Sequence, residues 1–230
     1  MKEVLIIIPA YNEEANIQRV VETVISCCPD YDYIVINDGS TDRTEEICLA
    51  NGYHLVSLPV NLGLAGAFQT GLKYAYRKGY SYAIQYDADG QHQADYITAI
   101  YTEIKKGYDI VIGSRFVTEK KPFNMRMLGS ALISFAMYLT TGQKIQDPTS
   151  GMRMFNRKMI GEFTRSLNYG PEPDTLSYLI KNGATVSEVQ VTMKERMAGE
   201  SYLKFGTSIS YMARMLASIL LIQNFRKRPV

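Results

Sequence analysis

Two short acidic turns contain the residues best suited to chemistry. One is Asp87-Ala88-Asp89-Gly90-Gln91, the other is Asn37-Asp38-Gly39-Ser40, and each directly follows a run of mostly apolar residues. Carboxylate and amide oxygens are ligands that suit Mg²⁺ or Mn²⁺, and such an ion would stabilise a departing diphosphate. The pattern Asp-x-Asp-Gly is also common in surface turns, so one such motif alone predicts a turn rather than a metal site. Two such turns at one sheet edge would form a site.

The segments around these turns alternate between strands and helices. Residues 4–8 and 33–36 are aliphatic runs typical of buried parallel strands, and apolar residues at three- and four-residue spacing predict a helix between them. The alternation continues with helices near 42–51, 66–78 and 96–105 and strands near 54–58, 82–86 and 110–112. This order predicts an α/β fold with a mostly parallel central sheet that helices cover on both faces. Ligands of such sheets bind at the carboxyl ends of the strands, where both acidic turns are expected.

The second half of the chain is less regular, but no change of composition separates it from the first half. It is therefore expected to complete the same fold. We predict one domain over residues 1–205, followed at 206–230 by a C-terminal helix and a basic tail.

Composition excludes several classes of protein. A net charge of +2 over 230 residues is too small to indicate a nucleic-acid-binding protein. Three cysteines without metal-ligand spacing favour a reduced, cytoplasmic setting. No export signal is visible, and the longest apolar stretches, 131–139 and 215–222, are shorter than the roughly 20 residues that span a bilayer.

Six motifs, in order along the chain, resemble family 2 glycosyltransferases. They are Ile8-Pro9-Ala10-Tyr11-Asn12-Glu13, Asn37-Asp38-Gly39-Ser40, Asn61-Leu62-Gly63, Asp87-Ala88-Asp89, Gly113-Ser114-Arg115 and Asp147-Pro148-Thr149-Ser150-Gly151-Met152-Arg153. Within that family, Asp89-Gly90-Gln91-His92 and Arg196-Met197-Ala198-Gly199-Glu200-Ser201 are similar to the polyprenyl-phosphate sugar synthases, the dolichol-phosphate mannose synthase group.

The resemblance implies a nucleotide-binding domain of the GT-A type and a set of site residues. The nucleotide would contact Pro9, Tyr11, Glu13, Asp38, Gly63, Asp87 and Ala88, and Asp89 and Gln91 would hold Mg²⁺ or Mn²⁺. The phosphate and acceptor contacts would be Arg115, Arg126, Arg153, Arg196 and Ser201. The catalytic set would be Asp87, Asp89, Arg115, Arg153 and Asp174. His92 is left outside the metal ligands because Gln91 matches the motif.

Some residues depart from the family pattern. Asn37 stands where an aspartate is usual, which removes a charge from the nucleotide turn. Tyr202 stands where lysine often follows the Gly-x-Ser segment, with Lys204 as a replacement. The chain has no Trp, so it lacks the Gln-x-x-Arg-Trp motif of polymerising synthases.

The resemblance therefore predicts an enzyme of the EC 2.4 class. It would move a hexose, with inversion, from UDP- or GDP-hexose to a polyprenyl phosphate carrier for cell-envelope glycan synthesis. A lipid phosphate is already ionised and needs no general base. The second reading is transfer to a hydroxyl of a lipid-linked or polysaccharide acceptor, which would need a carboxylate to take the proton of the hydroxyl. Asp174 or Glu172 could supply it, although capping of a helix over 175–181 explains both equally. A non-catalytic nucleotide-sugar-binding subunit is a third reading, which the intact acidic motif disfavours.

Membrane contact is a separate expectation. Residues 127–138 and 209–222 are apolar, and Arg226-Lys227-Arg228 follows the second segment. These helices could dock on the inner face of the cell membrane, pack in the core, or contact a second copy of the chain.

Overall fold

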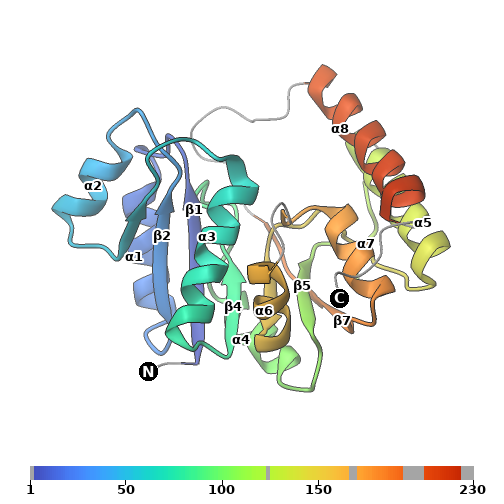
Figure 1. The fold of residues 1–230 in the computed structure, drawn as a ribbon, viewed down its shortest axis with the longest axis horizontal. Coiled ribbons are helices and arrows are strands. Elements are labelled where there is room, and N and C mark those ends of the chain that lie inside the picture. The colour runs from blue at the N-terminus through green and yellow to red at the C-terminus, as the bar shows by residue number, and fades with distance from the viewer. Residues whose placement is uncertain (1–2, 123–124, 166–169, 194–204, 224–230) are drawn as a thin grey trace.

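A seven-stranded sheet in the order β3-β2-β1-β4-β6-β5-β7 runs through the computed structural model (Figure 1). The structure describes residues 3–122, 125–165, 170–193 and 205–223. The strands are β1 (Val4–Ala10), β2 (Asp32–Asn37), β3 (Leu55–Ser57), β4 (Tyr82–Gln85), β5 (Ile110–Ser114), β6 (Arg153–Asn156) and β7 (Val186–Gln190). The helices are α1 (Ile17–Cys27), α2 (Thr44–Ala50), α3 (Gly63–Lys78), α4 (Tyr96–Ile104), α5 (Met125–Thr141), α6 (Arg157–Arg165), α7 (Pro173–Lys181) and α8 (Phe205–Ala217), with a π-helical turn η1 (Ser218–Ile222).

The sheet is parallel except at β6, which runs antiparallel to both β4 and β5. The predicted α/β fold with a mostly parallel sheet is confirmed. In the register, Ala10 at the end of β1 pairs with Asn37 at the end of β2, and Ile7 pairs with Gln85 at the end of β4. The carboxyl ends of these three neighbouring strands therefore lie at one edge, where both acidic turns begin.

Helices cover both faces of the sheet, and β1 is buried between them. Leu5 and Ile7 face a core shared with α3, α5, α6, α7 and α8. Val4, Ile6 and Ile8 face the opposite core, which α1 and α4 complete. Alternate side chains of a strand point to opposite faces, so a strand covered twice must be apolar throughout.

Helix α3 lies unusually close to β1. A methyl carbon on Gly71 would come within 2.3 Å of Ile7 Cγ2, so only glycine fits this contact without a shift. The helix ends at Gly79, whose φ of 82° is the left-handed conformation that commonly closes helices. Together these features fix the packing of α3 on β1 and the residue at which the helix ends.

The C-terminal helix packs on the domain. A methyl carbon on Gly129 of α5 would overlap Met212 of α8, and Met215 and Ile219 are almost fully buried. The apolar side predicted for this segment therefore lies largely in the core, whereas Leu220 is 40% exposed. The predicted boundary at residue 205 stays a prediction. Among the described residues, no helix has the length and apolar character needed to span a membrane.

Candidate active site

The loops after β1 and β2 are joined by hydrogen bonds. Asn12, with a φ of 54°, accepts the Thr41 backbone N–H at 2.8 Å and donates its own N–H to Ser40 Oγ at 3.0 Å. The Glu13 N–H donates to Thr44 Oγ1 at 2.9 Å. Asparagine tolerates this left-handed conformation better than most residues. Tyr11 and Glu13, two predicted nucleotide contacts, are thereby held close to the Asn37-Asp38-Gly39-Ser40 turn.

Asp38 joins the loop between β3 and α3 to the loops that follow β1 and β2. Its side chain is buried, and Oδ1 accepts the Leu62 backbone N–H at 2.8 Å. Burial raises the pKa of the Asp38 carboxyl, and the N–H groups of Leu62 and Gly63 partly offset this. A methyl carbon on Gly39 would lie 2.8 Å from the Asn61 nitrogen, so the turn and the loop fit only with glycine here. The structure thus brings Asp38 and Gly63, two predicted nucleotide contacts, together.

Glu13 occupies a buried position behind the first loop. Only 9% of the residue is exposed, and its Oε2 accepts the side-chain N–H of Asn16 at 2.8 Å. Pro9 is buried within β1, and Tyr11 is partly buried just beyond that strand. These three predicted nucleotide residues therefore form one continuous segment at the sheet edge.

The Asp87-Ala88-Asp89 motif begins two residues after β4. Asp89 Oδ1 accepts the Gln91 backbone N–H at 3.0 Å, and Gly90 between them has a φ of 75°. Ala88 is buried, whereas about a third of the Asp87 side chain, 32%, is exposed. The turn therefore holds the proposed metal pair within one short loop and leaves Asp87 open to a ligand.

The residues of this turn fit a divalent cation. Among the described residues, no group of three or more His, Cys, Asp or Glu could hold a metal alone. Asp89 and Gln91 supply two hard oxygens, and Mg²⁺ typically binds one or two protein carboxylates while substrate phosphates and waters fill the rest. The donor set therefore suits an ion that arrives with a diphosphate.

Arg115 is bound to the Asp147-Pro148-Thr149 loop. Its Nε and Nη2 donate to Asp147 Oδ2 and Oδ1 at 2.7 and 2.8 Å, and the Asp147 side chain is fully buried. Burial raises the pKa of the Asp147 carboxyl, but the hydrogen bonds and charge of Arg115 outweigh it and hold that pKa below its usual value. This predicted phosphate contact is thus already paired with a carboxylate.

Glu188 fixes the same loop from the edge strand β7. Its two carboxylate oxygens accept the backbone N–H groups of Gln146 and Asp147 at 2.6 and 2.8 Å. Glu188 is not among the residues predicted from the sequence. Its only signal is an acidic residue within a short strand, which periodicity cannot distinguish from a solvated position.

Arg153 is buried at the start of β6. The residue is 2% exposed and donates to the carbonyl oxygens of Ser150 and Pro148. Burial lowers the pKa of Arg153 to about 10, while Tyr211 and the carboxyls of Asp147, Asp87 and Asp174 raise it. The guanidinium therefore remains cationic at neutral pH and holds the loop that contains Pro148 and Ser150.

Asp174 lies in the first turn of α7 and joins it to the C-terminal segment. Its Oδ1 accepts the Thr175 N–H at 2.8 Å, and Oδ2 accepts the Ser218 hydroxyl at 2.7 Å. Glu172, at the N-cap position, makes no capping hydrogen bond with its side chain and lies 3.5 Å from Arg214. Burial and the charge of Asp174 raise the pKa of Glu172. Both oxygens of Asp174 are thus engaged in structural contacts.

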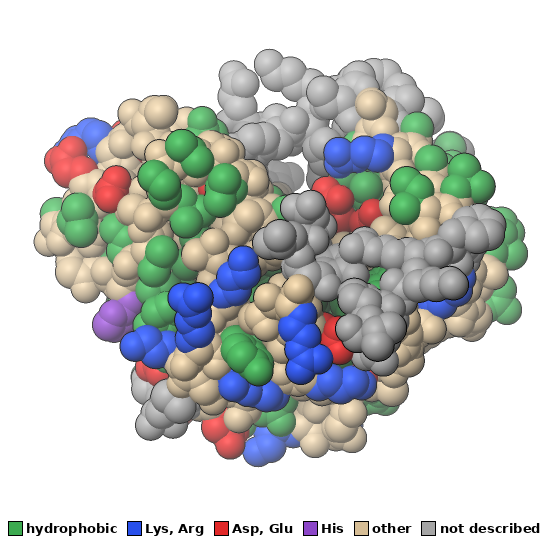
Figure 2. Space-filling view, viewed as in Figure 1, with side chains coloured by type: hydrophobic (Ala, Val, Ile, Leu, Met, Phe, Trp, Pro, Cys, Tyr) green, Lys and Arg blue, Asp and Glu red, His purple; other side chains and the backbone are tan. Residues whose placement is uncertain are grey.

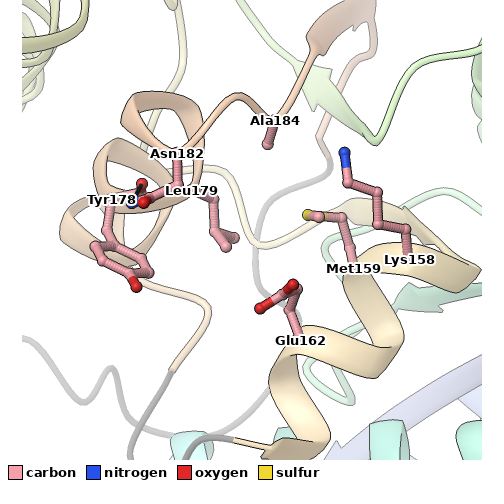
Figure 3. A pocket seen from close by; sticks show the side chains of 7 residues that line it. All are labelled: Lys158, Met159, Glu162, Tyr178, Leu179, Asn182 and Ala184. Carbon is pink, nitrogen blue, oxygen red and sulfur yellow. Dashed lines mark hydrogen bonds between the residues drawn. The ribbon is translucent and has the colours of Figure 1, made fainter. Parts of the chain in front are cut away.

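Three predicted acceptor residues receive no structural placement. The side chain of Arg126 and all of Arg196 and Ser201 lie outside the described residues. A hollow between α6 and α7 (Figure 3) is distant from the acidic turns and, at about 10 Å³, has room for about one water. Its lining is Lys158, Met159, Glu162, Tyr178, Leu179, Asn182 and Ala184, none of them a predicted site residue.

Comparison with known proteins decides the family. The model of glycosyl transferase family 2 matches residues 5–164. The chain belongs to this family. It is 31% identical over 211 residues to the polyprenol monophosphomannose synthase of Mycolicibacterium smegmatis, a match that covers 86% of this chain and 79% of the relative. It is 32% identical to the UDP-N-acetylglucosamine–dolichyl-phosphate N-acetylglucosaminyltransferase of Methanococcus voltae, covering 94% and 96% of the two chains.

The family 2 chain also shares its fold with a solved enzyme. Glucosyl-3-phosphoglycerate synthase from Mycobacterium tuberculosis in complex with Mn²⁺, UDP-glucose and phosphoglyceric acid superposes with a TM-score of 0.69 at 19% identity. That likeness covers 99% of this chain and 81% of the other. The predicted GT-A fold is confirmed, and the chain is a glycosyltransferase of the EC 2.4 class by family.

Proposed function

We propose that the protein transfers a hexose from UDP- or GDP-hexose to a polyprenyl phosphate, with inversion, for cell-envelope glycan synthesis. The observation that carries the proposal is that the Asp38 turn and the turn from Asp87 to Gln91 lie at the carboxyl ends of β2 and β4, the two strands that flank β1. The lipid-phosphate acceptor is supported by the activities of the relatives in Mycolicibacterium smegmatis and Methanococcus voltae.

In this proposal, the donor nucleotide lies on the unit formed by the first two loops. Pro9, Tyr11, Glu13 and Asp38 contact the nucleoside, and Asp87 meets the sugar side of the donor. Asp89 and Gln91 hold Mg²⁺ or Mn²⁺, which supplies positive charge to the departing diphosphate. Fixed donors and charges at the reacting centre lower the barrier because they need no reorganisation.

A phosphate acceptor and a hydroxyl acceptor make different demands on the site. A hydroxyl would require a carboxylate to take its proton, and Asp174 or Glu172 could supply it. Asp174 accepts hydrogen bonds from Thr175 and Ser218, which give this carboxylate a structural role. An ionised lipid phosphate requires no such base, and the activities of the relatives favour it.

The acceptor also implies contact with a bilayer, at the cytoplasmic face. Helix α5 exposes an apolar stripe, defined here as Leu128, Leu132, Phe135 and Leu139, and hydrophobic side chains appear along the edge formed by α5 and α8 (Figure 2). These residues recur every three or four positions and so share one helix face. We assign this stripe to the membrane surface.

The direct test supplies purified protein with Mn²⁺, polyprenyl phosphate and labelled UDP-glucose, UDP-N-acetylglucosamine or GDP-mannose. The expected product is an acid-labile sugar lipid that extracts into organic solvent. Product formed only with saccharide acceptors would replace the proposal with transfer to a hydroxyl of a lipid-linked or polysaccharide acceptor.

The metal assignment has its own test. Asp89→Asn should reduce turnover by about 100-fold or more, because it removes the one charged ligand of the proposed cation. Calorimetric titration of Mn²⁺ in the presence of UDP should show the same loss. The exposed Asp95→Asn variant, with the same charge change at the start of α4, is the control. Unchanged metal affinity in Asp89→Asn would refute the assignment.

A further inference from the structure

Asp87 is held on three sides by residues that have no assigned role. Gln85 at the end of β4 donates to its carboxylate, His92 accepts its backbone N–H, and Gly151 lies against its carboxylate. We infer that Gln85, His92 and Gly151 form a cradle that fixes the Asp87 carboxylate for donor binding. The inference rests on the proposed function, since it assigns Asp87 to the donor.

Gln85 controls one oxygen of that carboxylate. It is 1% exposed in a strand that is otherwise lined by apolar neighbours, and its Nε2 donates to Asp87 Oδ1 at 2.8 Å. The reverse amide orientation would place two acceptors against each other, so the donor assignment follows from the contact. The Gln85 Oε1 is buried without a hydrogen-bond partner among the described residues.

Because this oxygen is unpaired, the N–H₂ group is the part of the Gln85 amide that contributes a contact. Burying an amide oxygen without a partner is unfavourable, and an apolar side chain at this strand position would avoid the cost. Among the described residues, the N–H···O bond to Asp87 is the hydrogen bond that the Gln85 amide makes. A charge-assisted bond of this kind fixes the rotamer of the carboxylate and keeps one oxygen in place.

His92 holds the backbone of the same residue. It is 5% exposed, and its Nδ1 accepts the Asp87 backbone N–H at 3.1 Å. An accepting Nδ1 places the ring proton on Nε2, which lies 3.7 Å from Asp87 Oδ2. The His92 carbonyl in turn accepts the hydroxyl of buried Tyr86 at 2.7 Å, which anchors the histidine to the strand end.

Gly151 supplies the space that the carboxylate occupies. A methyl carbon on this residue would lie 2.6 Å from Asp87 Oδ2 and 3.4 Å from Gln85 Nε2. Any larger side chain would therefore displace the carboxylate or break its bond to Gln85. Because 32% of the Asp87 side chain stays exposed, the three neighbours orient it without covering it. Gln85 and His92 are positioning residues in this account.

Gln85→Glu is the sharpest test because it keeps the shape and replaces the donating N–H₂ with an acceptor. We expect the KM and Kd for the preferred donor among UDP-glucose, UDP-N-acetylglucosamine and GDP-mannose, with Mn²⁺, to rise about tenfold or more. The matched control is Gln143→Glu. The Gln143 Nε2 donates to the Val186 carbonyl at 2.9 Å, and this hydrogen bond involves none of the predicted site residues. Thermal unfolding of both variants establishes that each is folded.

Two further variants separate positioning from general structure. His92→Asn, which retains an acceptor, should restore the donor KM that His92→Leu raises. In an Asp87→Ala background, Gln85→Glu should cause no further loss, because the group that it positions is gone.

The outcomes distinguish this inference from the proposed function. Wild-type protein that binds none of the three donors overturns both. Wild-type protein that binds a donor which Gln85→Glu binds equally well overturns the cradle alone. Equal losses from Gln85→Glu with and without Asp87 also overturn it, because they indicate a merely structural glutamine.

Discussion

At the scale of single residues, Asp147 is the most heavily paired carboxylate near the site. It has no exposed side-chain surface and accepts two hydrogen bonds from the Arg115 side chain. A buried charge of this kind is tolerated only when its partner stays in place, so loss of either member is costly. The pair holds Arg115 close to the predicted diphosphate site and anchors the loop that carries Gly151.

Asp147→Asn should lower the free energy of unfolding by about 3 kcal/mol at neutral pH, because it leaves Arg115 without its countercharge. The folded-state pKa of Asp147 is depressed. Its stabilisation is therefore complete above the unfolded pKa of about 3.9 and is lost as the pH falls through the folded value. Urea unfolding between about pH 7 and pH 2 should show a shallower acid loss in the variant than in wild type. An equally steep loss in Asp147→Asn would contradict this, with the exposed Asp30→Asn as control.

Residue types and spacing were sufficient to predict the acidic turns, because their positions follow from the ends of apolar strands. Spacing could not show that Arg115 is paired with Asp147, or that Gln85 is turned toward Asp87. Arg115 and Asp147 belong to segments that are distant in sequence. Gln85 ends a strand whose sequence pattern does not show which way its side chain points. The predicted roles of the site residues stay predictions.

At the scale of elements, one carboxylate joins α7 to η1. Asp174 accepts the Ser218 hydroxyl and lies 3.4 Å from Gln223 Nε2, across more than forty residues of sequence. π-helical turns are uncommon and frequently lie at functional sites. The contact fixes the C-terminal segment against the first turn of α7.

Asp174→Ala should destabilise the protein by about 1–3 kcal/mol, because the Ser218 hydroxyl and the Thr175 N–H lose their acceptor. Hydrogen exchange within residues 218–222 should accelerate in this variant. Asp174→Asn keeps an acceptor oxygen, so turnover with polyprenyl phosphate should fall by less than about tenfold. A loss of about 100-fold or more would instead identify Asp174 as a general base.

The helices and strands of the first half could be predicted from apolar periodicity, with ends displaced by a few residues. Strand β6 could not, because its four residues include the buried Arg153 and run antiparallel between two parallel strands. The side of α8 that packs inward was also ambiguous. Met215 and Ile219 are suited to a core and to a membrane, and only the contact with α5 decides between them.

At the scale of the whole molecule, one face combines a basic region with an apolar edge. Lys and Arg side chains gather over α3 and α6, whereas the edge formed by α5 and α8 displays hydrophobic side chains (Figure 2). The apolar stripe of α5 is 47–62% exposed, while Ile133 and Met137 on the opposite side of the helix are buried. An exposed apolar helix face of this kind supports the proposed contact of α5 with a bilayer interface.

The double substitution Leu132→Ser and Phe135→Ser tests this assignment. Each side chain is about half exposed, so its transfer to the interface contributes about 1 kcal/mol, and the pair should reduce vesicle affinity about 30-fold. Co-sedimentation with phosphatidylglycerol vesicles that contain polyprenyl phosphate measures the loss. Leu49→Ser on α2, where the leucine is 65% exposed, should leave binding unchanged. Unaltered vesicle affinity, together with a change from dimer to monomer in analytical ultracentrifugation, would show that the stripe binds a second copy of the chain rather than the membrane.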